Sequence, residues 1–119
     1  GATFMMANET GTAFTEVSFS QYIFCQRTNM VDLNADGHLD AFSCHDTNAN
    51  VRFLNDGTGN LTFMQGGLGE TCGNYGSIWT DYDNDGDQDL YISKQFQFPQ
   101  RLEGPGDILT GQGDLAPYP

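Results

Sequence analysis

Short stretches rich in aromatic, aliphatic and β-branched residues alternate with polar, glycine-rich stretches along this chain, and no window shows sustained helical periodicity. In the middle of the chain the pattern predicts four strands separated by turns. The predicted strands are a stretch ending at Val31, followed by residues 39–45, 51–54 and 61–64. The residues between the last two, 55–60, have the composition of a hairpin turn. We therefore expect an all-β fold.

The four-strand unit recurs with an offset of 49 residues, the distance from Asp32 to Asp81 (81 − 32 = 49). The same offset superposes further pairs: Phe4 on Phe53, Phe14 on Phe63, Ala41-Phe42 on Leu90-Tyr91, and Arg52-Phe53 on Arg101-Leu102. Four short antiparallel strands in about 50 residues are typical of a β-propeller blade. The sequence therefore predicts an incomplete propeller-like array of two to two and a half blades.

This repeat divides the single domain, residues 1–119, into three parts. Residues 1–20 are expected to form a half blade, and residues 21–69 a complete blade. Residues 70–119 are expected to form a second blade with a degenerate end, because Gly104-Pro105-Gly106-Asp107 lacks the Asn-Asp-Gly turn found at 55–57. Arg101-Leu102 is the predicted third strand of that blade.

Two acidic segments, residues 32–40 and 81–89, share the pattern D-x-[DN]-x-D-G-x-x-D. Side-chain oxygens at positions 1, 3, 5 and 9 can converge on one hard cation, and Gly at position 6 allows the sharp reversal that points the position 7 carbonyl inward. Oxygen-only ligands suit Ca²⁺ better than Zn²⁺ or copper. The alternative is an acidic surface turn without a metal. Two copies with the same spacing favour the metal, since unneutralised clusters of this density repel themselves.

These segments lack the features of EF-hands. An EF-hand needs a bidentate Glu at position 12, where this chain has Ser43 and Ile92, and a helix on each side. The flanking residues are short and rich in aromatic or β-branched side chains, which favours strands. Each segment is therefore predicted to be a calcium loop that joins two β-strands.

The residues at 80–92, TDYDNDGDQDLYI, resemble the central motif of FG-GAP/VCBS-type repeats, which form calcium-binding β-propellers such as integrin α-chain heads and some fungal lectins. Residues 53–62, FLNDGTGNLT, resemble the accompanying hairpin, and the resemblance covers roughly residues 4–103. It implies two Ca²⁺ sites with side-chain ligands from Asp32, Asn34, Asp36, Asp40, Asp81, Asp83, Asp85 and Asp89. It also implies backbone carbonyl ligands from His38 and Asp87.

A closed propeller typically has roughly four to eight blades, more than this chain contains. Two interpretations follow. The chain is either part of a longer propeller, with flanking blades as its partners, or a protomer that other copies complete. In the second case a half blade donated head to tail makes a homo-oligomeric ring or a filament, depending on the rotation between copies.

The net charge of −12, from 16 acidic and 4 basic residues, argues against nucleic acid and against anionic lipid surfaces as partners. Eight of the acidic residues lie in the two loops, so the predicted metal ligands account for a large part of the negative charge. No apolar run approaches the roughly 18 residues of a membrane span, so no membrane-spanning segment is expected.

Three cysteines, Cys25, Cys44 and Cys72, lack metal-binding spacing. Because calcium at millimolar levels is an extracellular resource, we expect an oxidising compartment and a secreted or cell-surface protein. One disulfide is expected there, with Cys25–Cys44 as the first choice and Cys44–Cys72 as the second; three free buried thiols are the alternative. Asn8 and Asn60 begin N-x-[ST] triplets and are predicted glycosylation sites if the protein is secreted. The start at Gly1 without Met indicates removal of a signal or pro-segment, or a trimmed chain.

Catalytic motifs are missing from the sequence, and no enzyme activity is expected. His38 lies in a predicted calcium loop. His45 follows Cys44, but two residues adjacent in the sequence do not provide the geometry that nucleophilic catalysis needs. We expect a calcium-stabilised structural or adhesive module that self-assembles or belongs to a larger propeller. The alternative is a lectin-like module that binds carbohydrate or protein, with a sugar-stacking surface made from aromatic residues: Tyr75, Trp79, Tyr82 and Tyr91.

Overall fold

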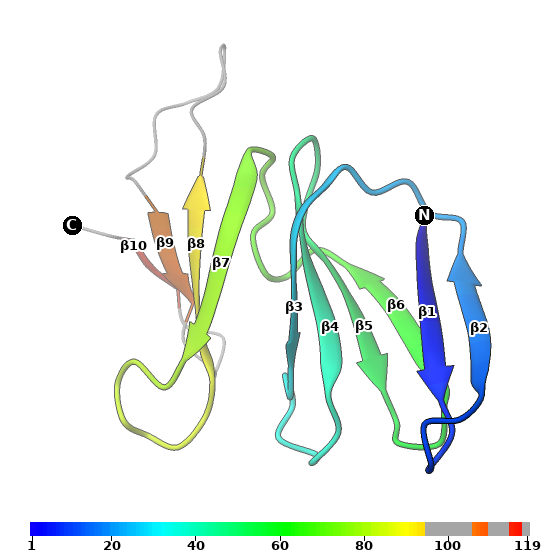
Figure 1. The fold of residues 1–119 in the computed structure, drawn as a ribbon. Coiled ribbons are helices and arrows are strands. Elements are labelled where there is room, and N and C mark those ends of the chain that lie inside the picture. Colours follow the sequence, from blue (N-terminus) through cyan, green and yellow to red (C-terminus); the bar gives the residue numbers. More distant parts are fainter. Residues whose placement is uncertain (95–105, 110–114, 118–119) are drawn as a thin grey trace.

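The computed structural model describes residues 1–94, 106–109 and 115–117, and these residues form strands in three antiparallel sheets without a helix (Figure 1). The first sheet pairs β1 (Ala2–Ala7) with β2 (Phe14–Phe19). The second has the order β3 (Cys25–Val31), β4 (Asp40–His45), β5 (Val51–Asn55) and β6 (Leu61–Gln65). The third has the order β10 (Leu115–Pro117), β9 (Gly106–Leu109), β8 (Asp89–Lys94) and β7 (Asn74–Thr80). Within the described part of the chain there is no helix long and apolar enough to cross a membrane.

The predicted all-β fold is confirmed, and the second sheet has strands close to the predicted positions, which are a stretch ending at Val31 and residues 39–45, 51–54 and 61–64. Its last two strands form a tight hairpin in which Phe53 lies opposite Phe63 and Asn55 opposite Leu61. The turn is held by the Asp56 carboxylate, which accepts hydrogen bonds from the Thr58 backbone N–H at 2.8 Å and from its hydroxyl at 2.6 Å. This is the local side-chain capping that Asp provides in turns.

Strand β4 is buried on both faces because it lies in the middle sheet: all six of its residues are buried. On one face, Ala41, Val51 and Phe53 form a cluster that contacts side chains of the first sheet. On the other face, Phe42 and Cys44 pack against Leu90 and Ile92 of the third sheet. The middle sheet is thus the centre of a three-layer arrangement.

Phe53 is the centre of the first cluster. Its ring lies 5.0 Å from that of Phe4, 4.9 Å from that of Phe19 and 5.5 Å from that of Phe63, measured between centroids. Two of these pairs are edge-on and one is tilted, which are the arrangements that aromatic quadrupoles favour. Because Phe4 and Phe19 belong to β1 and β2, these contacts attach the two-stranded sheet to the middle sheet.

Buried amides connect the middle sheet to the third sheet. Asn50 accepts a hydrogen bond from the His45 N–H and donates one to the Leu68 carbonyl, both at 2.8 Å. The Asn74 amide nitrogen lies within hydrogen-bond distance of three backbone carbonyls, of which the nearest is that of Thr71 at 2.7 Å. Both asparagines are almost completely buried, so these bonds fix the connection between β6 and β7 without competition from water.

The structure differs from two details of the predicted repeat. Phe4 lies opposite Val17, whereas Phe53 lies opposite Phe63, so the offset of 49 does not superpose Phe14 on Phe63. The reason is that the β1–β2 hairpin is longer: Phe4 and its partner Val17 are 13 positions apart (17 − 4 = 13), whereas Phe53 and its partner Phe63 are 10 apart (63 − 53 = 10).

The second difference is at the end of the chain. The strand that pairs with β8 is β9, so Gly106 and Asp107, predicted to belong to a degenerate turn, lie in a strand opposite Ser93 and Ile92. The edge of β8 is therefore paired by a later segment than the offset predicts. Arg101-Leu102, the predicted third strand, lies outside the described residues.

Candidate calcium sites

Both acidic loops join neighbouring antiparallel strands, β3 to β4 and β7 to β8 (Figure 1). They have the same backbone conformation at the positions that matter. Position 4 is left-handed in each, with φ of 57° at Ala35 and 61° at Asn84. Position 6 is also left-handed, with φ of 88° at Gly37 and 98° at Gly86, which is why glycine is required there.

In the first loop, the carboxylate of Asp32 organises the turn. It accepts hydrogen bonds from the backbone N–H groups of Asp36, at 3.1 Å, and Gly37, at 2.8 Å. Asp36 in turn accepts a hydrogen bond from the N–H of His38 at 2.9 Å. The carboxylates at positions 1 and 5 are therefore held in fixed orientations by the loop backbone.

The second loop repeats this pattern with its own residues. Asp81 accepts hydrogen bonds from the N–H groups of Asp85 and Gly86, both at 3.0 Å. Asp85 accepts one from the N–H of Asp87 at 3.2 Å. Two segments 49 residues apart thus fold into equivalent loops, as expected if both serve the same ligand chemistry.

The last aspartate of each loop is buried at the start of the following strand. Asp40 is 0% exposed, and its two oxygens accept hydrogen bonds from the N–H of Leu33, at 2.8 Å, and of Asn55, at 2.7 Å. Asp89 is 1% exposed and accepts one from the N–H of Tyr82 at 2.7 Å. These carboxylates connect each loop to the sheet.

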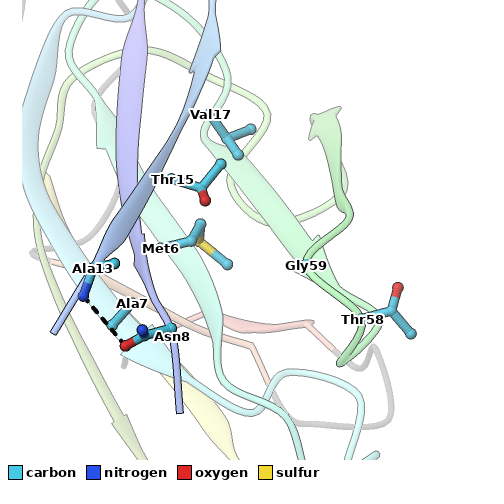
Figure 2. A pocket seen from close by; sticks show the side chains of 8 residues that line it. All are labelled: Met6, Ala7, Asn8, Ala13, Thr15, Val17, Thr58 and Gly59. Atoms are coloured by element: carbon cyan, nitrogen blue, oxygen red, sulfur yellow. Dashed lines mark hydrogen bonds between the residues drawn. The ribbon is translucent and has the colours of Figure 1, made fainter. Parts of the chain in front are cut away.

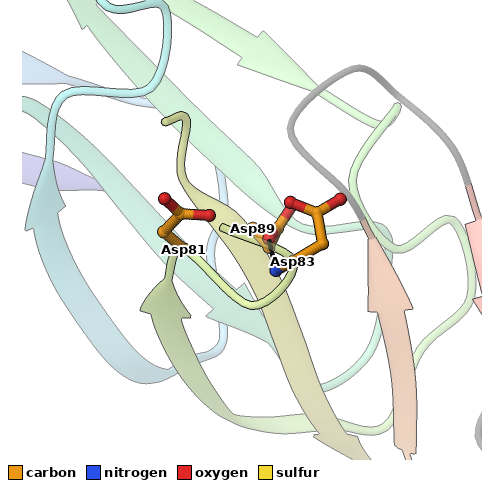
Figure 3. A group of neighbouring side chains, drawn as sticks. All are labelled: Asp81, Asp83 and Asp89. Carbon is orange, nitrogen blue, oxygen red and sulfur yellow. Dashed lines mark hydrogen bonds between the residues drawn. The ribbon is translucent and has the colours of Figure 1, made fainter. Parts of the chain in front are cut away.

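Three aspartates of the second loop converge. Asp81, Asp83 and Asp89 each offer a carboxylate oxygen within 4.8 Å of the others, and Figure 3 shows them projecting from the loop and from the start of β8. In the first loop Asn34 takes the place of Asp83, so one anionic donor is replaced by a neutral amide oxygen. The second loop therefore concentrates more negative charge than the first.

This concentration of charge changes the proton affinity of the second loop. Desolvation, followed by repulsion from Asp85 and Asp89, raises the pKa of Asp83. A hydrogen bond shared with the Asp85 side chain, together with desolvation and repulsion, raises the pKa of Asp87 to about 6. The backbone hydrogen bond from Asp87 lowers the pKa of Asp85. Because the pKa values of Asp83 and Asp87 are raised, protons would compete with a cation for these carboxylates as the pH falls.

The residues present fit a calcium ion. Every candidate donor is an oxygen, and one carboxylate oxygen of Asp87, Oδ1, is buried without a hydrogen-bond partner among the described residues. Such an acceptor is satisfied by a cation. Hard oxygen donors in a flexible loop are the ligand set that Ca²⁺ takes, and the ion would neutralise carboxylates that otherwise repel one another.

Comparison with known proteins places these loops in a family. The FG-GAP-like repeat profile matches residues 32–92, which is 61 of the 119 residues (92 − 32 + 1 = 61) and includes both loops. This chain belongs to the FG-GAP-like repeat family. No curated protein and no solved structure matches it.

In this FG-GAP-like repeat protein the side chain of His38 is exposed, and the space above Gly57 is taken by its imidazole ring. The predicted role of His38 rests on its backbone carbonyl, so the ring is left to contact the hairpin between β5 and β6. Asn55 is a further residue of the first site that the loop pattern does not predict, since its N–H donates a hydrogen bond to Asp40. Its place at the start of the Asn-Asp-Gly turn was the signal that could have revealed it.

In the structure of this FG-GAP-like chain Cys25 is exposed, Cys44 is buried and Cys72 is half-buried, and Cys25 and Cys44 are free thiols. Cys25 lies opposite His45, and Cys44 lies opposite Arg27, with a bulge between the two pairs. Burial raises the pKa of the Cys44 thiol. The Cys25–Cys44 disulfide is thus not formed here and stays a prediction for an oxidising compartment.

Both predicted glycosylation residues are exposed in turns. The Asn8 side chain accepts hydrogen bonds from the Thr12 N–H, at 2.9 Å, and the Thr10 hydroxyl, at 3.4 Å. The Asn60 amide donates to the side chains of Asp56 and Thr58 in the β5–β6 turn. Glycosylation at these residues stays a prediction.

Replacing Gly86 with alanine is expected to lower the free energy of unfolding by about 1–2 kcal/mol, the cost of a left-handed backbone for a residue with a Cβ. Apart from the two flanking residues, no atom of the described part of the chain lies within 4 Å of the added Cβ, so the expected loss comes from backbone strain. Urea denaturation of the variant measures it. The control is Gln88→Ala in the same loop, which is expected to change the free energy of unfolding by less than about 0.5 kcal/mol. A larger change in this control, or an unchanged free energy of unfolding in Gly86→Ala, contradicts the role of the left-handed backbone at Gly86.

Proposed function

We propose that this protein is a calcium-stabilised structural or adhesive repeat module of the extracellular space or cell surface, in which Ca²⁺ bound at each loop fixes the strands that leave it. The observation that carries the proposal is the equivalence of the two loops in backbone conformation and hydrogen bonding. Because the carboxylates repel one another without a cation, calcium binding and ordering of the loops are coupled.

The outer faces of the three-layer arrangement support a role in assembly. Met5 on β1, Phe14 on β2 and Ile78 on β7 are 58%, 60% and 58% exposed, although all three are large and apolar. Blades of a propeller cover such faces by stacking. We therefore propose that further blades, from a longer chain or from other copies in a ring or filament, pack on these sheets in the manner of VCBS-type and integrin-like propellers.

The calcium proposal is tested by titration calorimetry. The chain is expected to bind two Ca²⁺, and the Asp36→Ala and Asp85→Ala variants, altered at position 5 of each loop, one each. At a calcium concentration of about 100 times the Kd, one site contributes about 2.7 kcal/mol to the free energy of unfolding, so chelation is expected to lower the melting temperature. A wild-type stoichiometry of zero, or two ions bound by either variant, contradicts the proposal.

A lectin-like function is the second candidate, and one observation favours it: Tyr82, at position 2 of the second loop, is 65% exposed beside the candidate ligands. Tyr75 is also exposed, at 39%. Trp79 is not available for stacking on a sugar, because its ring packs edge-on against Phe42 at a centroid distance of 5.3 Å. A glycan array probed with and without chelator tests this candidate, and calcium-independent or absent binding contradicts it.

A further inference from the structure

A pocket of about 320 Å³ lies between the two-stranded sheet and the hairpin that joins β5 to β6. Figure 2 shows Met6, Thr15 and Val17 projecting from β1 and β2 towards the turn that carries Thr58 and Gly59. The full lining is Met6, Ala7, Asn8, Ala13, Thr15, Val17, Thr58 and Gly59. This volume is at the lower end of the range of small-molecule sites, roughly 300–1,000 Å³.

The lining determines the kind of ligand that fits. None of the lining residues is charged, in a chain with a net charge of −12. Asn8 uses its side chain within its own turn, and the Thr58 hydroxyl donates to Asp56. The hydroxyl of Thr15 makes no hydrogen bond within the described residues and can orient a ligand. Apolar walls with one available hydroxyl suit a small, uncharged, largely apolar molecule.

Anionic molecules are disfavoured at this pocket. Asp56 lies in the same turn as Thr58 and Gly59, and its hydrogen bonds with Thr58 lower its pKa to about 2. The carboxylate is therefore ionised throughout the usual pH range. With the overall negative charge of the chain, it repels anions from the hairpin wall.

One wall of the pocket is attached to the first acidic loop. The N–H of Asn55 binds Asp40 at 2.7 Å, and the Asn55 amide donates to the Leu39 carbonyl at 3.0 Å. The Asn55 side-chain oxygen accepts a hydrogen bond from the N–H of Gly57 at 2.9 Å, and Gly57 lies against the His38 ring. The position of the turn at 56–60 therefore depends on the conformation of residues 38–40.

We propose that this pocket binds a small uncharged apolar molecule, and that calcium in the first loop strengthens the binding by holding the hairpin wall in place. The second part rests on the proposed calcium function. Calcium orders the loop, the loop fixes Asn55 and Gly57, and these fix Thr58 and Gly59. A site that is already ordered costs less conformational entropy to fill, so the two ligands bind with positive coupling.

The test uses N-phenyl-1-naphthylamine, a neutral dye that fluoresces in apolar surroundings, with the full chain. Saturable binding of one dye per chain is expected. The Thr15→Trp variant fills the pocket and is expected to weaken binding at least tenfold. The matched control is Thr62→Trp, since Thr62 is exposed on β6 and does not line the pocket. Equal affinities of these two variants overturn the site.

The coupling is tested with the position 5 variants. Calcium is expected to raise the affinity of the wild type for the dye about fivefold or more. Asp85→Ala, which alters the second loop, keeps this increase, whereas Asp36→Ala, which alters the first, loses it. Calorimetry on the same samples separates the two ideas. Calcium binding without any change in dye affinity overturns the coupling alone, and no calcium binding overturns the proposed function.

A second copy of the chain is the competing occupant. It is revealed by a dimeric native mass together with a dye affinity that falls as protein concentration rises, and that result overturns the assignment to a small molecule. A monomeric mass with dye affinity independent of protein concentration supports it.

Discussion

Replacement of Phe53 with alanine is expected to lower the free energy of unfolding by about 3–5 kcal/mol, the range for deletion of a buried aromatic ring. Phe53 is 1% exposed and contacts the rings of Phe4, Phe19 and Phe63. The cost combines lost burial, lost edge-on aromatic contacts and an unfilled cavity. Because Phe4 and Phe19 belong to the two-stranded sheet, the variant is also expected to detach that sheet.

Two measurements check this expectation. Urea denaturation gives the change in the free energy of unfolding, and amide hydrogen exchange gives the protection of β1 and β2 compared with β4. The control is Phe14→Ala, which removes a ring that is 60% exposed and is expected to change stability by less than about 0.5 kcal/mol. Similar losses in the two variants, or unchanged exchange in β1, contradict the central role of Phe53.

The Asp40→Ala variant is expected to lose about 2–6 kcal/mol even in the presence of chelator. Asp40 is completely buried, and its two oxygens hold the N–H groups of Leu33 and Asn55. Alanine leaves both donors without a partner, and each buried unsatisfied donor costs about 1–3 kcal/mol. Chelator is included so that the measured loss is structural and does not include the loss of bound calcium.

Asp36→Ala is the matched control, because Asp36 is a candidate ligand of the same loop but is exposed. In chelator it is expected to cost less than about 1 kcal/mol, whereas both variants lose first-loop calcium binding. Asp40→Asn keeps one acceptor oxygen and is expected to fall between the two. If Asp40→Ala and Asp36→Ala are equally stable in chelator, the structural role of Asp40 is wrong.

Comparison of β8 with the middle sheet shows which parts of the fold local sequence patterns predict. The strands of the middle sheet were predictable because hydrophobic runs such as 51–54 are bounded by residues with strong turn preferences, as in the hairpin at 55–60. The pairing of β8 with β9 was not predictable from the offset of 49. The pairing of a strand edge with a later segment depends on hydrogen bonds between residues far apart in the sequence. The repeat pattern is also weaker after Lys94, so the sequence does not mark the partner strand.

The candidate sites also combine local features, which the sequence predicts, with contacts that depend on the fold. The loop positions followed from the D-x-[DN]-x-D-G-x-x-D pattern, since glycine at position 6 and acidic side chains at fixed spacing are local properties. The contact between Asp40 and Asn55 joins residues 15 positions apart and appears only once β4 and β5 are paired. For the same reason the contact between Trp79 and Phe42, which are far apart in the sequence, does not follow from a local pattern.

That contact has a practical consequence. Trp79 is the only tryptophan of the chain, and its half-buried indole lies between the middle and third sheets. Trp79 pairs with Leu90, which follows Asp89 in the sequence, and Trp79 itself is two positions before Asp81. The indole is therefore close to the second acidic loop. The protein therefore carries a built-in fluorophore whose emission moves to longer wavelength when the layers separate. No extrinsic label is needed to follow unfolding at this interface, or events in the neighbouring loop, in real time.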